Sequence, residues 1–223
     1  MFTSNVWGLI TSYLLIFIVI GISTVLQKKK ILGDEGARKF IHIGVSNWWI
    51  LAMIFFEGSQ GVWYAIIPPI TFIILNYLSY RLNLVKAMER GGKGNLGTVY
   101  FPISLLILVI LSFGVFNNPY IGAMGILILG YGDGLAAVIG KKYGKHPLAF
   151  GKSVEGTVTM FIASLIVAVV ITSMLYPILL AILISLGVAL VAALVELYTP
   201  KGLDNLSVPL LVSLVFYLFI LAV

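Results

Sequence analysis

Residues Tyr120–Gly140 read YIGAMGILILGYGDGLAAVIG, and Asp133 is the one charged residue in this run. A helix needs about 20 mainly apolar residues to cross the hydrocarbon core of a bilayer, so the run predicts a membrane-spanning helix. An ionisable group inside such a helix is costly, and a functional role is its expected explanation. Asp133 is therefore the first candidate site residue.

The composition extends this prediction to the whole chain. The 223 residues are 61% hydrophobic and 10% charged, whereas a soluble domain carries roughly 25% charged residues. We predict an all-α polytopic membrane bundle that forms one domain over residues 1–223. Eight apolar runs are long enough to be spans, with seven as the alternative because the second is short and the sixth and seventh adjoin: Val6–Leu26, Phe40–Phe56, Val62–Leu82, Val99–Phe116, Tyr120–Gly140, Thr157–Tyr176, Pro177–Val195 and Leu206–Ala222.

The positive charges lie in alternate loops. With eight spans, all 14 Lys and Arg residues fall in or at the edge of the first, third, fifth and seventh loops. The positive-inside rule makes that face cytoplasmic and places both termini on the non-cytoplasmic side of the cell (plasma or inner) membrane. The net charge of +6 fits attraction to phosphates or anionic lipid headgroups, and nothing besides charge suggests nucleic acid as a partner. The absence of cysteine excludes disulfides and thiol chemistry.

Small residues surround Asp133 at helical spacing. Gly130 precedes it by three positions, and Ala137 and Gly140 follow by four and seven, so an α-helix places them on one face with the acid. Such a face suits close helix packing as well as a ligand, and both interpretations of the glycines stay open. For the carboxylate, a divalent cation is the natural occupant, because Mg²⁺ prefers one or two carboxylates together with substrate phosphates and water.

The next loop contains a candidate phosphate site, Gly151-Lys152-Ser153. It is not a P-loop, because His146 stands where the required glycine should be and no strand precedes it. A Gly-flanked Lys-Ser pair directly before a helix still favours an anion, through backbone N–H groups and the positive end of the helix dipole. Glu155 and Thr157 lie in the first turn of that helix. The alternative is a solvated basic loop in which Ser153 or Thr157 caps the helix.

Three more polar clusters lie on the same predicted face. Arg38 and Lys39 precede His42 by about one helical turn, either as ligand contacts or as interfacial anchors. The glycine-rich run Gly91–Thr98 is either a ligand-covering loop or a plain connector. Glu196 and the pair Asp204-Asn205 flank the last loop, where Asp204 and Asn205 contact a ligand or cap the last helix. The sequence contains no Ser/His/Asp triad and no His/Cys metal-binding pattern.

Taken in order, these residues resemble the CTP-dependent lipid-alcohol kinases. That family includes phytol kinase, dolichol kinase and the yeast-type diacylglycerol kinase, and it is distantly similar to phosphatidate cytidylyltransferase. The matching positions run from residue 38 to residue 209: Arg38-Lys39-x-x-His42, Gly97-Thr98-x-Tyr100, Gly132-Asp133 with Ala136 and Gly140, Gly151-Lys-Ser-x-Glu-Gly156, Glu196, and Asp204-Asn205 with Val208-Pro209. The chain lacks the long additional membrane portion of dolichol kinase and any plastid-targeting region, so we expect a minimal enzyme of prokaryotic type.

The resemblance implies an integral membrane kinase that transfers the γ-phosphoryl group of CTP to a lipid hydroxyl. The expected acceptor is an isoprenoid alcohol (phytol, geranylgeraniol or a polyprenol) or diacylglycerol, and the expected cofactor is Mg²⁺. Asp133 and Glu155 are the expected metal ligands and, with Lys152, the catalytic residues; His42 is a weaker candidate for the general base. The expected nucleotide-binding residues are Arg38, Lys39, His42, Gly132, Gly140, Lys141, Gly151, Ser153, Gly156 and Asn205.

Two other functions share some of these features. A cytidylyltransferase would use the same nucleotide and metal but would make a CDP-lipid and release pyrophosphate. A transporter would place polar groups near the bilayer midplane on broken helices, and Pro68-Pro69 marks either such a break or a tolerated kink. The kinase is favoured because the Gly-Lys-Ser-x-Glu-Gly run resembles that branch and because the polar groups gather at one interface.

Overall fold

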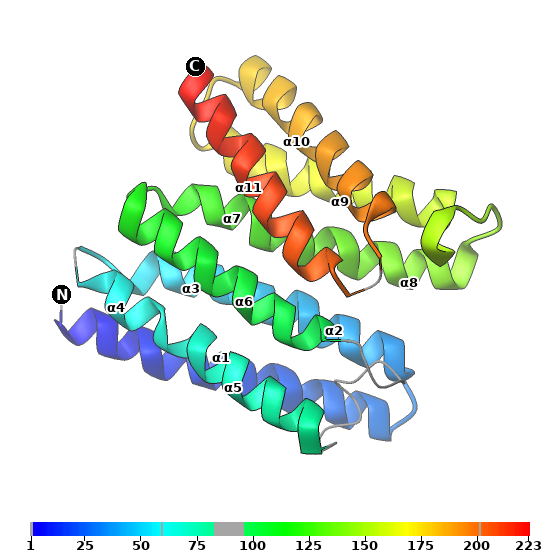
Figure 1. Cartoon of the computed structure of the whole chain (residues 1–223), viewed down its shortest axis with the longest axis horizontal. Coiled ribbons are helices and arrows are strands. Elements are labelled where there is room, and N and C mark those ends of the chain that lie inside the picture. Colours follow the sequence, from blue (N-terminus) through cyan, green and yellow to red (C-terminus); the bar gives the residue numbers. More distant parts are fainter. Residues whose placement is uncertain (1, 59, 83–95, 201) are drawn as a thin grey trace. The chain divides into compact units, whose positions relative to one another are not determined.

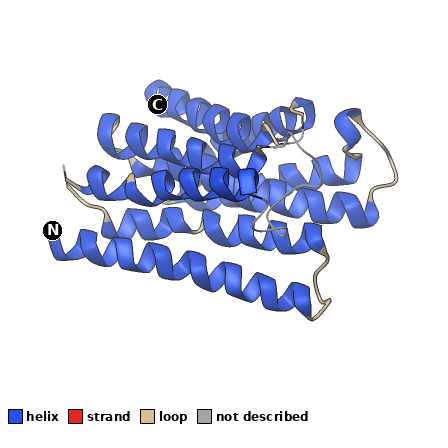
Figure 2. Ribbon diagram, turned by 60° about the horizontal axis from the view of Figure 1, so that its bottom comes forward, coloured by secondary structure: helices blue, strands red, loops and turns tan. Residues whose placement is uncertain are grey.

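The structure, a computed structural model, describes residues 2–58, 60–82, 96–200 and 202–223. Over these ranges the regular elements are helices, without a β-strand (Figure 2). The chain divides into two compact units, Met1–Pro119 and Tyr120–Val223. The prediction of a polytopic helical membrane bundle is confirmed, because seven of the described helices are long and apolar enough to cross a membrane. The single domain over residues 1–223 stays a prediction.

The described residues of the first unit form seven helices. Figure 1 labels α1 to α6, and the seventh, η2, directly continues α6. Helix α1 packs against α2 and α3, and α5 packs against α6. The indole of Trp48 on α3 donates to the Ser12 hydroxyl of α1 over 2.7 Å, which satisfies two buried polar groups at once. The bounds are α1 Phe2–Lys28, α2 Asp34–Ser46, α3 Trp48–Phe55, α4 Gly61–Ala65, α5 Ile67–Leu82, α6 Gly97–Val109 and the π-helix η2 Ile110–Val115.

The expected span Phe40–Phe56 differs from a single membrane helix. It is covered by α2 and α3, of 13 and 8 residues, which are separated at Asn47. The polar first half of α2, with Asp34 and Glu35 in its first turn, reduces its apolar length further. Among the described residues, seven helices meet the length and hydropathy of a span by themselves. Helices α2 and α3 follow each other through residues 34–55 and both pack against α1, so the count of eight crossings stays a prediction.

A helix break precedes Pro68-Pro69. Helix α4 ends at Ala65 and α5 begins at Ile67, so both prolines lie in the first turn of α5. Proline is tolerated there because the first N–H groups of a helix have no intrahelical acceptor. The two helices together still make one span of suitable length, Gly61–Leu82.

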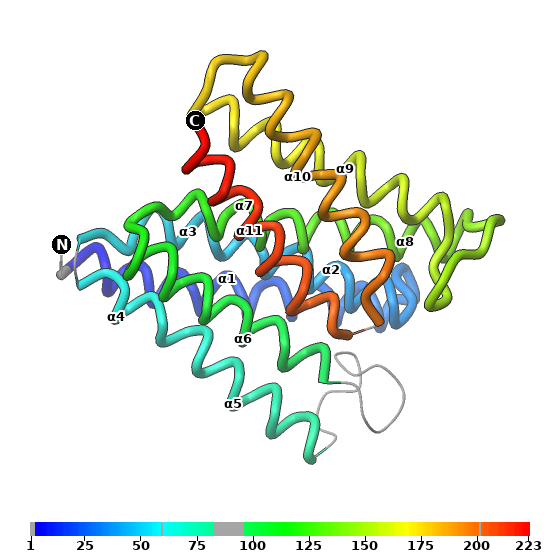
Figure 3. Tube along the Cα trace, turned by 45° about the horizontal axis from the view of Figure 1, so that its top comes forward, coloured from blue at the N-terminus to red at the C-terminus, as the bar shows by residue number. Residues whose placement is uncertain are grey.

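The second unit contains the segment around Asp133. Helices α9 and α10 pack against each other along their length (Figure 3), and α8 packs against α9. The connection from α9 to α10 is short, and Pro177 directly precedes α10. The bounds are α7 Pro119–Ile128, the π-helix η3 Leu129–Asp133, α8 Gly134–Tyr143, the 3₁₀ turn η4 Ala149–Gly151, α9 Val154–Ser173, α10 Ile178–Tyr198 and α11 Asp204–Ala222.

Small residues let the α7–η3–α8 segment approach its neighbours closely. A Cβ added at Gly125 would collide with the Pro209 carbonyl and the Ser213 hydroxyl of α11. A Cβ at Gly132 would lie 2.6 Å from the Met160 sulfur of α9. The glycines of this segment are therefore needed for helix packing, as small residues at membrane helix contacts generally are.

Gly125→Ala is expected to destabilise the protein by about 1–3 kcal/mol, because the added methyl group meets backbone and cannot be accommodated by a rotamer change. Thermal unfolding in detergent measures the loss. Gly21→Ala is the matched control, since a Cβ at Gly21 has nothing within 4 Å. Equal melting temperatures of the two variants would contradict the close contact.

Candidate functional site

Asp133 lies at the end of a π-helix. The segment Leu129–Asp133 has π-helical hydrogen bonding between two α-helices, and Asp133 is only 4% exposed. A π-helix inserts extra backbone into a helix, changes the direction of the side chains and is frequent at functional sites. The sequence predicted a continuous α-helix here, so the orientation of the acid is set by a distortion that the apolar pattern did not reveal.

Residues 146–154 form a small hairpin between α8 and α9. The Leu148 N–H donates to the Lys152 carbonyl over 2.8 Å, and the Val154 N–H donates to the His146 carbonyl over 3.0 Å. The turn passes through Phe150 and Gly151, both at positive φ (56° and 69°). Glycine adopts this conformation without strain. The hairpin thus fixes the backbone position of Lys152 just ahead of α9.

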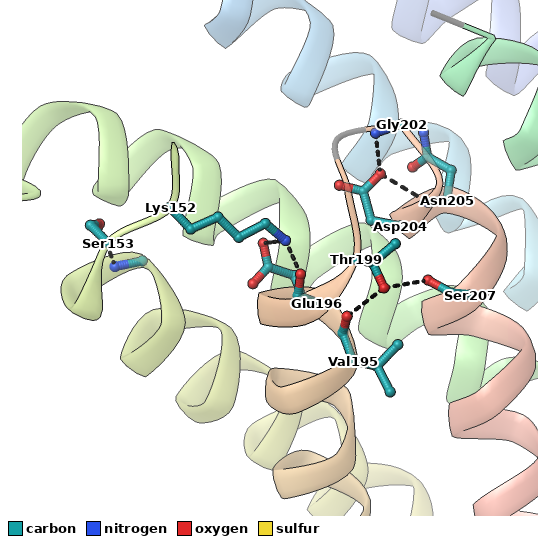
Figure 4. A network of polar contacts seen from close by, with 10 residues as sticks. Lys152, Ser153, Val195, Glu196, Thr199, Gly202, Asp204, Asn205 and Ser207 are labelled. Atoms are coloured by element: carbon teal, nitrogen blue, oxygen red, sulfur yellow. Dashed lines mark hydrogen bonds and ion pairs between the residues drawn. The ribbon is translucent and has the colours of Figure 1, made fainter. Parts of the chain in front are cut away.

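Lys152 makes a buried ion pair with Glu196 of α10. The Lys152 Nζ lies 2.7 Å from Glu196 Oε1, and the two side chains are 8% and 9% exposed. The same ammonium group donates to the backbone carbonyl of Glu196 (Figure 4). A buried charge of this kind persists when it is paired and hydrogen-bonded, and both conditions are met here.

Two more acids lie near this pair. The charges of Asp133 and Asp204 both act on the Glu196 carboxylate. Asp204 opens α11 and accepts the backbone N–H groups of Gly202 and Asn205, each over 3.0 Å. Asp133, Glu196 and Asp204 are all less than 9% exposed. Three helical elements of the second unit thus bring carboxylates to one polar region that contains Lys152.

The Glu155 carboxylate contacts His146. It lies 2.8 Å from His146 Nδ1, on the exposed side of the hairpin. Within the described ranges, no group of three or more His, Cys, Asp and Glu residues is placed to hold a metal ion by itself. The assignment of Glu155 as a metal ligand beside Asp133 stays a prediction.

The glycines and Ser153 lie where α8 meets α9. Ser153 caps α9, accepting the Gly156 N–H over 3.2 Å, as the alternative interpretation of this loop predicts. A Cβ at Gly140 would lie 3.4 Å from the Gly156 Cα, so these two glycines permit close backbone contact. Gly132 also lies in a helix contact, while Gly151 forms the hairpin turn and Lys141 is exposed. Nucleotide contacts of these residues stay predictions.

The cluster on α2 belongs to the first unit. Arg38 pairs with Glu35, one turn earlier on the same helix. Lys39 is 2% exposed, although a positive-inside anchor would be expected to reach the headgroups. The His42 ring packs against Phe101 of α6, with ring centroids 5.0 Å apart. Of the glycine-rich run Gly91–Thr98, residues 91–95 lie outside the described residues, and Gly97 begins α6.

Glu196, like Asp204, matches the family pattern but is not among the expected metal, catalytic or nucleotide-binding residues. Its position appeared to follow the span Pro177–Val195, whereas α10 continues to Tyr198 and carries Glu196 in its last turn. The sequence feature that points to Glu196 is an acid directly after a long apolar run; Asp133 was identified similarly, as an acid within such a run. The partner of Glu196, Lys152, lies 44 positions away in the sequence, so their pairing is a property of the fold.

Comparison with known proteins finds several relatives. A phytol kinase of Synechocystis sp. is 33% identical over 214 residues, which cover 91% of this chain and 86% of the relative. Phytol kinase 1 (chloroplastic) of Arabidopsis thaliana is 27% identical, and a probable phytol kinase 1 (chloroplastic) of Oryza sativa is 29% identical; each match covers 64% of this chain. The chain spans about half the length of these two plant proteins. No family profile and no solved structure matches it significantly.

Proposed function

Because the chain belongs to the phytol kinase family, we propose that it transfers the γ-phosphoryl group of CTP to the hydroxyl of an isoprenoid alcohol or of diacylglycerol. Family membership supports the kinase activity on a lipid alcohol. The donor CTP and the identity of the acceptor are the finer parts of the proposal. They derive from the resemblance of the Gly132-Asp133 and Gly151–Gly156 runs to the CTP-dependent kinases.

The observation that carries the proposal is the buried polar region of the second unit. Lys152, with Asp133 nearby, provides a fixed cation and a carboxylate at the end of helices whose other surfaces are apolar. Phosphoryl transfer requires mainly positioning and charge neutralisation, because the protein supplies little covalent chemistry. A buried lysine beside carboxylates meets both requirements.

Mg²⁺ is the cofactor that the family implies. Asp133 offers the oxygen ligand that Mg²⁺ takes, and this ion is often bound by one or two carboxylates plus phosphates and waters. A cage of three protein ligands, which the described residues do not form, is therefore not required. The residues fit the ion: Asp133 would hold it, with Glu155 as the second proposed ligand. When bound, Mg²⁺ would neutralise charge on the β- and γ-phosphates.

The protein's own groups have separate proposed roles. Lys152 and the N-terminus of α9 neutralise phosphate oxygens, and Arg38 and Lys39 are the further proposed cations. The acceptor oxygen bonds to the γ-phosphorus as the bond to the bridging β–γ oxygen breaks and CDP leaves. The hydroxyl proton passes to a base, for which Asp133 is the first candidate and His42 the second.

Labelled nucleotide tests the reaction. In proteoliposomes containing phytol, geranylgeraniol, a polyprenol or diacylglycerol, γ-labelled CTP is expected to label one of the lipids, whereas cytidine-labelled CTP leaves them unlabelled. ATP in place of CTP is expected to support a much lower rate. Cytidine on the lipid would establish the cytidylyltransferase instead, and absence of both labels with every lipid would reject the function.

The proposed site faces the cytoplasm in the membrane of the cell. This orientation predicts that single cysteines at Lys145 and Glu57, both exposed and placed in a cysteine-free chain, react with an impermeant maleimide from opposite sides. Lys145 lies in the cationic loop, and Glu57 lies in a loop without Lys or Arg. Labelling of both from one side of sealed vesicles would contradict the arrangement.

A further inference from the structure

We propose that Glu196 is a positioning residue that holds the Lys152 ammonium group where it meets the phosphates of the nucleotide. This role deepens the proposed function and rests on it. It adds to the site a residue that the sequence-based set does not contain. Glu196 itself need not touch the substrate, because it acts through the side chain of Lys152.

The contacts between the two residues specify one position for the ammonium group. Lys152 Nζ is held by the Glu196 carboxylate over 2.7 Å and by the Glu196 backbone carbonyl. An ammonium group has three N–H donors. Two are directed to Glu196, and we assign the third to a phosphate oxygen of the bound nucleotide.

The end of α10 reinforces this position. Glu196 lies in the last turn of the helix, and its carbonyl also accepts the Thr199 N–H over 3.3 Å. The last carbonyls of a helix carry partial negative charge and favour a cation. The ammonium group is therefore attracted by both the side chain and the helix end. The backbone of Lys152 is fixed independently, by the hairpin at residues 146–154.

Such restraint matters because lysine is a flexible residue. Its four-carbon stem carries a point charge with many rotamers, unlike the rigid fork of arginine. Glu196 removes that freedom before the nucleotide binds. Protein kinases also pair a phosphate-binding lysine with a glutamate of a helix, although their lysine lies on a strand and their fold is unrelated.

Glu196→Gln tests the role because it keeps the shape and removes the charge. The expected result is a fall of about tenfold or more in kcat/KM for CTP, with the KM for the lipid alcohol unchanged. Thr199→Val is the matched control: it removes the hydrogen bonds of the Thr199 hydroxyl to Ser207 and to the Val195 carbonyl at the same helix end (Figure 4), and it keeps both contacts of Lys152 with Glu196. Equal changes in the CTP and lipid parameters, or equal losses in both variants, would show a merely structural role.

Chemical labelling of Lys152 tests the same role without catalysis. An amine-reactive reagent followed by peptide mass spectrometry should label Lys152 at least about fivefold faster in Glu196→Gln than in the wild type, while the rate at the exposed Lys145 stays constant. Glu196→Asp, whose shorter side chain reaches less far, should lie between them. An unchanged Lys152 rate in both variants overturns the positioning role.

Protection by CTP separates the two levels of the proposal. In the wild type, CTP with Mg²⁺ is expected to slow labelling of Lys152, and Glu196→Gln should need about tenfold more CTP for the same protection. Failure of CTP and ATP alike to protect the wild-type lysine would count against the proposed function. Protection with the same concentration dependence in both proteins would count against Glu196 alone.

Discussion

Asp133→Asn is expected to lower the rate of lipid phosphorylation by at least about 100-fold, while the protein stays folded. The substitution keeps the volume of the buried side chain and removes the charge that is proposed to hold Mg²⁺. Transfer of label from γ-labelled CTP to the lipid in proteoliposomes measures the rate. Elution as a single symmetric peak from gel filtration in detergent verifies the fold.

Asp34→Asn is the control for this substitution. Asp34 is an exposed acid at the start of α2 that bonds to Gln27, and its amide variant should retain wild-type activity. If Asp133→Asn also retained it, Asp133 could be neither the metal ligand nor the base. A higher Mg²⁺ concentration for half-maximal rate in a partly active Asn variant would support the metal role over the base role, because an amide oxygen is a weaker ligand than a carboxylate.

Lys152→Met is expected to lower kcat/KM for CTP by at least about 100-fold. Methionine is similar in length and lacks the charge that neutralises the phosphates. The substitution also leaves the buried Glu196 carboxylate without its cation, so the melting temperature should fall as well. Initial rates at varied CTP and thermal unfolding are the two measurements.

The two effects of Lys152→Met are separated by a second substitution. Lys152→Met with Glu196→Gln removes the uncompensated charge and should recover stability without recovering activity. Lys145→Met, in the exposed part of the same loop, should change neither quantity. Recovery of activity together with stability would show that Lys152 serves the fold and not the phosphates.

The membrane-bundle class and Asp133 were accessible from the sequence for the same reason. Whether a segment enters the bilayer depends on the hydrophobicity of consecutive residues. An apolar run and a single acid within it can therefore be recognised from the sequence without knowledge of the fold. The Ser153 cap was foreseen as an alternative for a similar reason, since the capping contact to Gly156 spans only three residues. Helix ends were less accessible: α10 extends beyond Val195 and carries Glu196 into the helix.

Other features depended on interactions that adjacent residues do not encode. The π-helix before Asp133 and the division of Phe40–Phe56 at Asn47 change helix geometry without changing the apolar pattern. The contact of the Glu155 carboxylate with His146 also depends on the hairpin, which brings together residues nine positions apart.

By itself, the sequence determined the membrane class and identified the acid at position 133. Local hydrophobicity decides which segments enter the bilayer, and an ionisable residue within such a segment is energetically costly and therefore conspicuous. Tertiary structure alone decided that Lys152 meets Glu196, 44 positions away, because a buried ion pair forms only where packed helices exclude water and bring distant residues together.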